Sequence, residues 1–241
     1  MIVKKLLKSW PRRLLLLRIS KFAIAITLAL SIIVVGLSIY MNNVGNFVIS
    51  IEKTERLSIS LSENNDFISN ASSLLYAKGM SDVTHATYAN IPTDIDNLGY
   101  GGHNDEADKR YSAYTFFLKN TSPIDVSYSM SIEINQLYKN VDGAVRVMVI
   151  KDGERTIYAK RDAQGNVISY TGGNAPQGMI ATYDTVPFAD ERTVCNEFTP
   201  VLREAQVVKY TVVMWLEGFD EDCVDSIKGG AIRMTMHFKA Q

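Results

Sequence analysis

Residues 127–135, SYSMSIEIN, alternate small polar side chains with large apolar ones, and residues 231–239, AIRMTMHFK, follow the same rule. A period of two puts one kind of side chain on each face of a β-strand. Both stretches therefore predict strands with one buried face and one solvated face, as in an antiparallel sheet that covers a core. They decide the fold class, which is all-β.

Other strand signals run from residue 44 onward. Residues 143–160, GAVRVMVIKDGERTIYAK, predict a hairpin with Asp152-Gly153 at its turn. Residues 212–216, VVMWL, are apolar on both faces, which favours a central strand. We expect about eight strands, at roughly 44–52, 56–62, 111–119, 127–135, 144–151, 155–160, 207–217 and 230–239.

Many short strands and few helices predict a jelly-roll-like or Ig-like antiparallel β-sandwich. Two long irregular stretches, 63–110 and 161–206, interrupt the strands. Short helices are expected after Ser81, a good N-cap residue, and near Asp220.

A different pattern precedes the strands. Residues 1–21 carry seven Lys and Arg side chains and no acid, and residues 22–40, FAIAITLALSIIVVGLSIY, are uncharged and almost wholly apolar. About twenty apolar residues are enough for a helix to cross a bilayer, and flanking cations stay in the cytoplasm. The sequence thus predicts a basic cytoplasmic N-terminus (1–21), a transmembrane signal-anchor helix (22–41) and an extracytoplasmic domain (42–241).

The fate of the apolar segment admits two alternatives. The segment is longer than the 7–15 apolar residues of a typical cleavable signal, which favours a retained anchor. Gly36-Leu37-Ser38 nevertheless resembles a small-x-small cleavage site, and its use would make the protein a secreted one. The expected location is therefore the cell membrane, in a single pass with the C-terminal domain outside, or the exterior if the segment is cut.

The charge distribution argues against nucleic acid as a partner. Beyond residue 21 the chain holds 18 basic and 26 acidic side chains, a net charge of −8. An acidic body without a basic stripe repels phosphate backbones. We expect the membrane as a partner through the N-terminal helix, together with self-association or a cell-surface protein.

Acidic residues gather in the stretch 93–110, TDIDNLGYGGHNDEADKR. Asp94, Asp96, Asp105 and Asp108, around His103, are the metal-ligand candidates, because Ca²⁺ prefers several carboxylate oxygens. The alternative is a solvated acidic loop, and the sequence has no EF-hand spacing. No other cofactor is indicated.

A second acidic group follows the apolar strand signal 207–217 and either binds a cation or begins a short helix that Gly229-Gly230 ends. Its members are Glu217, Asp220, Glu221, Asp222 and Asp225. Cys195 and Cys223 are the only cysteines, and they either form one disulfide or remain free thiols.

The sequence carries no catalytic signature. It has no H-E-x-x-H, no G-x-S-x-G, no P-loop and no G-x-G-x-x-G. His237 lies on the polar face of its predicted strand, where it is expected to be a solvated residue. We assign no catalytic residue and expect a protein that is not an enzyme.

Several strand segments carry a family resemblance: VGNFVISI (44–51), YSAYTFFLKN (111–120), AVRVMVIKDG (144–153), YTVVMWLEG (210–218) and CVDSIKGGAIRMTMHF (223–238). They resemble small exported proteins of Gram-positive bacteria of unassigned function and, more distantly, the camelysin and TasA biofilm-matrix family. The resemblance implies a jelly-roll-like sandwich outside the cell. It also implies assembly into fibres through an N-terminal strand donated to a neighbour.

The functional expectation is a structural or interaction role at the bacterial cell surface or in the biofilm matrix. Residues 44–51 are β-prone, uncharged and free of proline, which suits a strand that adds to an open sheet edge. The alternatives are a metal-dependent surface hydrolase or peptidase of the camelysin type and a Ca²⁺-binding extracellular module.

Overall fold

The computed structural model describes residues 22, 24, 26–33, 47–52 and 58–241. The predicted basic terminus 1–21 lies outside the described residues, as do residues 23, 25 and 34–41 of the predicted membrane helix. Residues 26–33 are helical, and among the described residues no helix is both long and apolar enough to cross a membrane. The chain divides into two compact units, Met1–Val44 and Gly45–Gln241, and the second is described here by itself.

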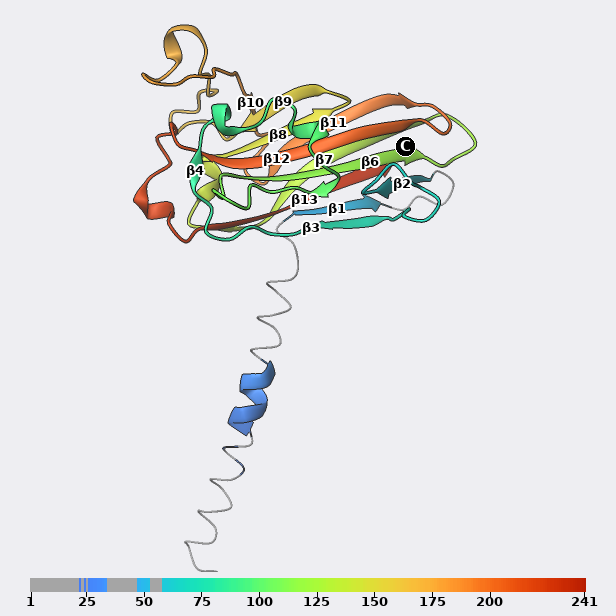
Figure 1. The fold of residues 1–241 in the computed structure, drawn as a ribbon, viewed down its shortest axis with the longest axis horizontal. Helices are drawn as coiled ribbons and strands as arrows, with labels where there is room; N and C mark the ends of the chain where they lie inside the picture. Colours follow the sequence, from blue (N-terminus) through green and yellow to red (C-terminus); the bar gives the residue numbers. More distant parts are fainter. Residues whose placement is uncertain (1–21, 23, 25, 34–46, 53–57) are drawn as a thin grey trace, which may run out of the picture. The chain divides into compact units, whose positions relative to one another are not determined.

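Gly45–Gln241 forms two β-sheets packed on one another, which confirms the predicted mostly-β sandwich (Figure 1). One is five-stranded, in the order β11 (Thr193–Leu202), β7 (Val126–Tyr138), β13 (Ala231–Ala240), β1 (Phe47–Glu52) and β3 (Leu74–Ala77). The other is eight-stranded, with a main path β10 (Val186–Pro187), β9 (Glu154–Ala159), β8 (Val145–Lys151), β12 (Val207–Glu217), β6 (Tyr111–Asn120) and β2 (Ile59–Ser62). The short β4 (His85–Ala86) pairs with β12, and β5 (Gly101–Gly102) pairs with β6.

Short 3₁₀ turns connect these strands, namely η1 (Tyr88–Asn90), η2 (Ile95–Asn97), η3 (Val141–Gly143), η4 (Gly172–Asn174) and η5 (Asp225–Ile227). The helix predicted to begin at Ser81 is wrong, whereas near Asp220 the chain has turns followed by the one-turn 3₁₀ helix η5. Thr84 donates its backbone N–H to Lys109 O at 2.9 Å, so the first segment pairs with a distant loop. The second is a series of turns, in which Asp220 N bonds Glu217 O at 3.1 Å.

Strand pairing corrects the purely antiparallel expectation at three places. Most pairs are antiparallel, but β1 runs parallel to β13, β10 to β9 and β4 to β12. A hairpin forces its two strands to be antiparallel, whereas β1 and β13 come from opposite ends of the unit and are free of that constraint. The predicted β8–β9 hairpin is present, with positive φ angles of 48° at Asp152 and 90° at Gly153, as tight hairpin turns require.

Strands β3 and β11 lie in stretches predicted to be irregular. At only four residues, β3 is too short for a period to emerge. The alternation in β11 is broken by register shifts between Thr193 and Cys195 and between Thr199 and Leu202. Pro200 also weakens its strand signal, and a proline is tolerated there because β11 is an edge strand.

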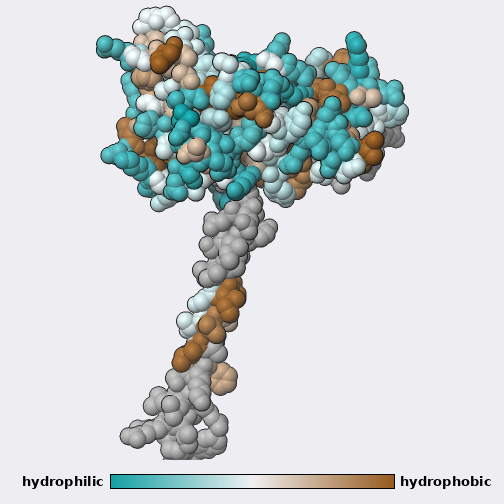
Figure 2. All heavy atoms as spheres, in the orientation of Figure 1, coloured by the Kyte–Doolittle hydropathy of each residue, from teal (hydrophilic) through white to brown (hydrophobic). Residues whose placement is uncertain are grey.

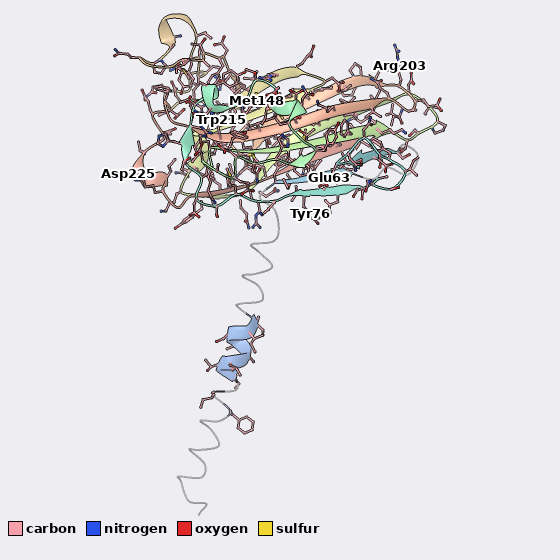
Figure 3. All side chains as sticks on the ribbon, in the orientation of Figure 1. Glu63, Tyr76, Met148, Arg203, Trp215 and Asp225 are labelled. Atoms are coloured by element: carbon pink, nitrogen blue, oxygen red, sulfur yellow. The ribbon has the colours of Figure 1, made fainter. Side chains whose placement is uncertain are left out.

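The eight-stranded sheet has a core on each of its faces. Phe116, Tyr210 and Phe238 pack in the core between the two sheets, with ring centroids 5.3–5.9 Å apart. A second core, which includes Met148 and Trp215 (Figure 3), lies under the segments that cross the outer face. Residues 212–216 are apolar on both faces because β12 contributes to both cores, as their pattern predicted.

The five-stranded sheet has a polar outer face. Ser127, Ser129 and Ser131 of β7 lie there, while Tyr128 and Met130 point into the core. In the view of Figure 2 most of the sandwich surface is hydrophilic, with apolar residues scattered over it. Single exposed apolar side chains of this kind are normal on a water-facing surface and need no special explanation.

Candidate functional site

Strand β1 is the first strand of the sandwich unit, and it lies inside the five-stranded sheet rather than at its edge (Figure 1). It pairs in parallel with β13, from Phe47 opposite Met234 to Glu52 opposite Lys239. On its other side it pairs antiparallel with β3, with Ser50 opposite Leu74. A segment near the start of the unit therefore fills a slot between two strands that come later in the chain.

The inward side chains of β1 complete the core between the sheets. Phe47 is 1% exposed and Ile49 is fully buried. Burial of a large apolar side chain stabilises by about 1.5–3 kcal/mol, so these two residues supply several kcal/mol. Removing β1 would open an apolar slot and leave the backbone groups of β13 and β3 that face it without partners.

The outward side chains of β1 make polar contacts with β13. Ser50 Oγ lies 2.9 Å from His237 Nδ1, and Lys239 Nζ lies 2.9 Å from Glu52 Oε1. The Lys239–Glu52 pair is half exposed or more on both sides and contributes at most about 1 kcal/mol. These contacts set the register of β1, while its buried side chains hold it.

His237 also faces an acid, with its Nε2 3.9 Å from Glu133 Oε2. Ser50, His237 and Glu133 thus stand in the order of a serine nucleophile, a base and an orienting acid. The backbone around Ser50, however, is engaged in ladders with both β13 and β3. This backbone does not offer the converging N–H groups that stabilise an oxyanion, so the contacts among these three side chains serve to join strands.

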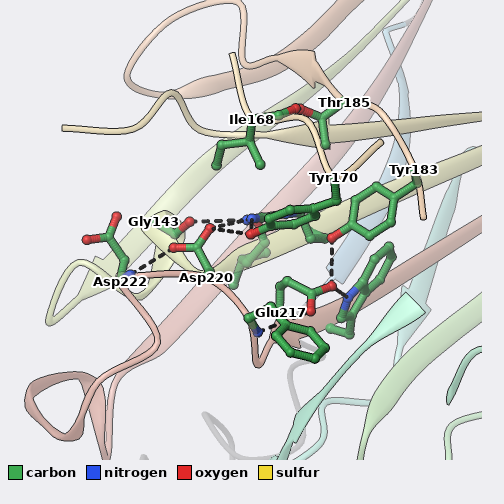
Figure 4. Close-up of polar contacts among 12 residues, drawn as sticks. Gly143, Ile168, Tyr170, Tyr183, Thr185, Glu217, Asp220 and Asp222 are labelled. Atoms are coloured by element: carbon green, nitrogen blue, oxygen red, sulfur yellow. Dashed lines mark hydrogen bonds and ion pairs between the residues drawn. The ribbon is translucent and has the colours of Figure 1, made fainter. Parts of the chain in front are cut away.

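A buried polar cluster lies on the outer face of the eight-stranded sheet (Figure 4). We name it the Arg146 cluster, and its members are Arg146, Tyr170, Tyr183, Trp215, Glu217 and Asp220. Strand β8 supplies the arginine, β12 supplies Trp215 and Glu217, and the loops supply the remaining three. The cluster therefore joins three separate parts of the chain.

Arg146 is fully buried and forms an ion pair with Asp220. Its guanidinium also donates to Tyr170 Oη at 3.1 Å and, at 3.3 Å each, to the carbonyls of Gly143 and Val145. Its Nε has no partner. A buried guanidinium with one unpaired N–H depends strongly on the charge of its single carboxylate partner.

Glu217 is also fully buried, and it accepts hydrogen bonds from Tyr183 Oη at 2.6 Å and Trp215 Nε1 at 3.1 Å. Desolvation by burial raises the pKa of the Tyr183 hydroxyl far above its ordinary value. Burial likewise raises the pKa of Tyr170, to about 12. Both tyrosines are therefore neutral donors at physiological pH, and they tie the 168–185 loop to the end of β12.

The acids after β12 have a structural role in this geometry. Asp220 neutralises Arg146, and its other oxygen accepts the N–H of Asp222 at 2.8 Å. Asp222 packs against Gly143, where an added Cβ would lie 2.5 Å from Asp222 Oδ2. The junction thus ends β12 and anchors loops. Arg146 within the apolar run 144–150 was the sequence signal for it, because a buried cation needs a carboxylate partner.

The four predicted metal ligands do not converge. Asp105 and Asp108 both pair with Arg110, at 2.7 Å each, whereas Asp96 pairs with Lys209 at 3.2 Å. Asp94 lies at the start of η2. Within the described residues, no group of three or more His, Cys, Asp and Glu side chains is placed to hold a metal ion.

His103, around which these acids were expected to gather, is held by main-chain carbonyls. Its Nδ1 lies 3.1 Å from Gly101 O and its Nε2 lies 3.1 Å from Ile95 O. The prediction of a calcium site on Asp94, Asp96, Asp105 and Asp108 is not supported by this arrangement, because three of the carboxylates are already matched by cations of the chain itself.

Both cysteines are free thiols, so the disulfide alternative is not realised in the structure. Cys195 is buried in the core between the sheets, 3.8 Å from Met130 Sδ. Burial raises the pKa of its thiol to about 12, which makes it unreactive. Cys223 lies in the connection between β12 and β13, close to Asp220, and burial raises its pKa as well.

Comparison with known proteins adds no assignment. No family model matches the chain, and no curated protein matches it. Among solved structures, a β-glucosidase from Kluyveromyces marxianus in complex with glucose is similar at 10% identity with a TM-score of 0.25. The similarity covers 75% of this chain and 15% of that chain. At this TM-score it carries no argument about function.

Proposed function

We propose that this chain is a membrane-anchored or secreted extracytoplasmic β-sandwich with a structural or interaction role at the bacterial cell surface or in the biofilm matrix. Its assembly step would be the exchange of β1 between copies. The seven cations ahead of an uncharged apolar run support the anchor. The resemblance to the camelysin and TasA family supports the location.

The main support for the exchange is the position of β1 in the five-stranded sheet. It lies at the start of the unit, it is bonded on both sides, and its Phe47 and Ile49 fill a slot that the later strands form. A neighbour's β1 offers the same hydrogen bonds and the same side chains. Exchange of an identical element changes few contacts in total, which is why domain swapping is a low-cost route to assembly.

The strand order supports the finer assignment to a jelly roll. The orders β1-β13-β7-β11 and β6-β12-β8-β9 are those of its two sheets, with β1 in the place of the first strand. The parallel direction of β1 is the one departure. A first strand that retains its position but not its direction suits an element that enters the sheet after the remaining strands have paired.

A disulfide trap tests the exchange. Ser50→Cys and His237→Cys are combined in the full chain, with both native cysteines replaced by alanine, because the two positions are register partners whose polar atoms lie 2.9 Å apart. In a self-contained copy the engineered pair closes within one chain. Exchange makes it close between chains, and non-reducing electrophoresis then shows a concentration-dependent ladder.

The matched control places cysteines at Glu133 and Thr235, which are register partners on β7 and β13. That pair should close within one chain under every condition, because neither strand leaves the sandwich. The proposal fails if the full chain assembles while the β1 pair still closes only within single chains. It fails equally if no assembly forms at any concentration.

A further inference from the structure

A buried carboxylate outside the Arg146 cluster has one oxygen without a hydrogen-bond partner. Asp142 lies in η3, between β7 and β8, and its side chain is 1% exposed. Its Oδ2 accepts a hydrogen bond from Lys160 Nζ at 2.9 Å, whereas its buried Oδ1 makes no hydrogen bond to any part of the chain that the structure describes. A carboxylate taken out of water is costly unless it is fully paired and hydrogen-bonded. Loss of the charge of Asp142 would therefore lower the cost of burying it.

The surroundings of Asp142 are apolar. Residues 141–145 are all buried, and Val141 and Val145 belong to the core between the sheets. Burial disfavours the charged forms of an acid and an amine, so the neutral pair lies closer in free energy to the ion pair here than it does in water. Transfer of one proton along the 2.9 Å hydrogen bond converts the ion pair into a neutral amine on Lys160 and a neutral carboxylic acid on Asp142.

A second acid contacts the same amine. Glu191 Oε2 lies 3.0 Å from Lys160 Nζ, and the Glu191 side chain is 84% exposed. Asp190 fixes the turn that carries Glu191, because its Oδ1 accepts the N–H groups of Arg192 and Thr193 at 2.8 Å each. Desolvation by burial lowers the pKa of Lys160, but hydrogen bonds to the two acids raise it above its ordinary value. The ion pair is therefore the resting state, and a reaction of the neutral amine is slow.

The amine thus touches one buried carboxyl group that it can attack and one exposed carboxylate that can move a proton. We propose that Lys160 and Asp142 form an intramolecular amide bond. The neutral Lys160 Nζ attacks Asp142 Cγ, so that the Nζ–Cγ bond forms and one Cγ–O bond breaks. Glu191 takes a proton from the attacking nitrogen and returns it to the leaving oxygen, which departs as water. One water is lost for each bond, Glu191 is unchanged at the end, and the buried oxygen that remains belongs to a neutral amide.

The amide would close the open end of the β8–β9 hairpin. Arg146 pairs with Ala159 as the last register pair at that end, and the bond joins the residue after β9 to the turn before β8. A covalent link of this kind stabilises a fold by constraining the unfolded chain, as a disulfide does. Both cysteines are free thiols, and an amide, unlike a disulfide, withstands reducing agents.

Mass spectrometry of the full chain, purified in a neutral detergent and incubated until its mass is constant, tests the bond. We expect an intact mass about 18 Da below the mass calculated from the sequence and its measured N-terminus, which is the loss of one water. Trypsin digestion after denaturation should then release residues 140–146 joined to residues 156–161, because the amide blocks cleavage after Lys160. Fragmentation of the joined peptides locates the bond.

Three variants and an internal control assign the roles. Lys160→Arg and Asp142→Ala should each restore the full mass. Glu191→Gln should slow cross-linking at least about tenfold, and it should fold even if the Asp142 variant does not, because Glu191 is exposed. Lys239 and Glu52 are the matched control, since they have the same 2.9 Å separation but are half exposed or more on both sides, and their peptides should stay separate.

Three outcomes would overturn the proposal. In the first, the chain retains its full mass and residues 140–146 and 156–160 are released as separate peptides. In the second, one water is lost but trypsin still cleaves after Lys160, which would indicate that Asp142 has cyclised onto the N–H of Gly143 instead. In the third, Lys239 and Glu52 are linked to the same extent, which would show that burial of the acid does not select the pair.

Discussion

Among substitutions that replace a charged loop residue by an uncharged one, Asp220→Asn should be one of the most destabilising. It keeps the size of the side chain and the oxygen that accepts the Asp222 N–H, but it removes the charge that balances Arg146. Arg146 is fully buried, and the side chain of Asp220 is 6% exposed. Breaking a buried ion pair from one side costs about 3–5 kcal/mol.

The neighbours of Arg146 place the cost at the lower end of that range. Tyr170 Oη at 3.1 Å and the carbonyls of Gly143 and Val145 at 3.3 Å still solvate the guanidinium partly. We therefore expect about 3 kcal/mol for Asp220→Asn. In a unit of this size that lowers Tm by about 6–12 °C.

Urea unfolding followed by tryptophan fluorescence measures the effect, because Trp215 lies in the same cluster. Arg146→Met and the double variant complete a double-mutant cycle. With both charges gone, the double variant should be more stable than the sum of the single effects predicts, by about 1.5–3 kcal/mol. Asp225→Asn, which removes an almost wholly exposed pair with Lys228, is the control and should change stability by less than about 1 kcal/mol.

The reasoning would be refuted by a coupling energy near zero. It would be refuted equally if Asp220→Asn cost no more than Asp225→Asn. Either result would mean that water reaches the Arg146 guanidinium and solvates it as well as the carboxylate does.

Three further predictions follow from the same contacts. Ile49→Ala should cost about 2–5 kcal/mol in urea unfolding, since this β1 side chain is fully buried. Burial raises the pKa values of Tyr170 and Tyr183 above the unfolded value of about 10, so the unfolded chain loses these protons first. The free energy of unfolding should therefore fall as pH rises above about 10, by up to about 1.4 kcal/mol per pH unit for each tyrosine. A free energy of unfolding that stays constant from pH 9 to 11 would contradict this. Addition of calcium or EDTA should leave the melting temperature unchanged, because Asp96 and Asp105 already form ion pairs with cations of the chain. A rise of several degrees with calcium would show instead that these ion pairs rearrange around a metal.

The sequence predicted the local parts of this fold well. Alternation identified β7 and β13, the Asp152-Gly153 turn identified the hairpin, and the two-faced apolar run identified β12 as central. Each of these signals lies within a few neighbouring residues. Period and turn chemistry are properties of the local backbone, so they can be read without knowing the remaining structure.

Apart from the helix expected at Ser81 and the missed strands β3 and β11, the failures concern partners that are distant in sequence. The acids of 94–108 formed a plausible ligand set by spacing, but Lys209 arrives from β12 to pair with Asp96. The parallel pairing of β1 with β13 joins the two ends of the unit, and no local sequence pattern predicts it. The only sequence signal for the Arg146 cluster was a cation inside an apolar run. Such a cation indicates that a carboxylate partner is needed, but it does not identify the partner.

The two sheets would have different parts in the proposed exchange. Strand β12 is bonded on both sides and buried on both faces, and the Arg146 cluster fixes the loops over it, so this half resists opening. In the five-stranded sheet β1 packs on one face only, and its outer contacts are half-exposed polar pairs. Because the Arg146 cluster lies on the far side of the other sheet, the proposed exchange of β1 would break no bond of that cluster. The proposed assembly by exchange requires such a fixed half to preserve the fold while the first strand of the unit is replaced by that of a neighbour.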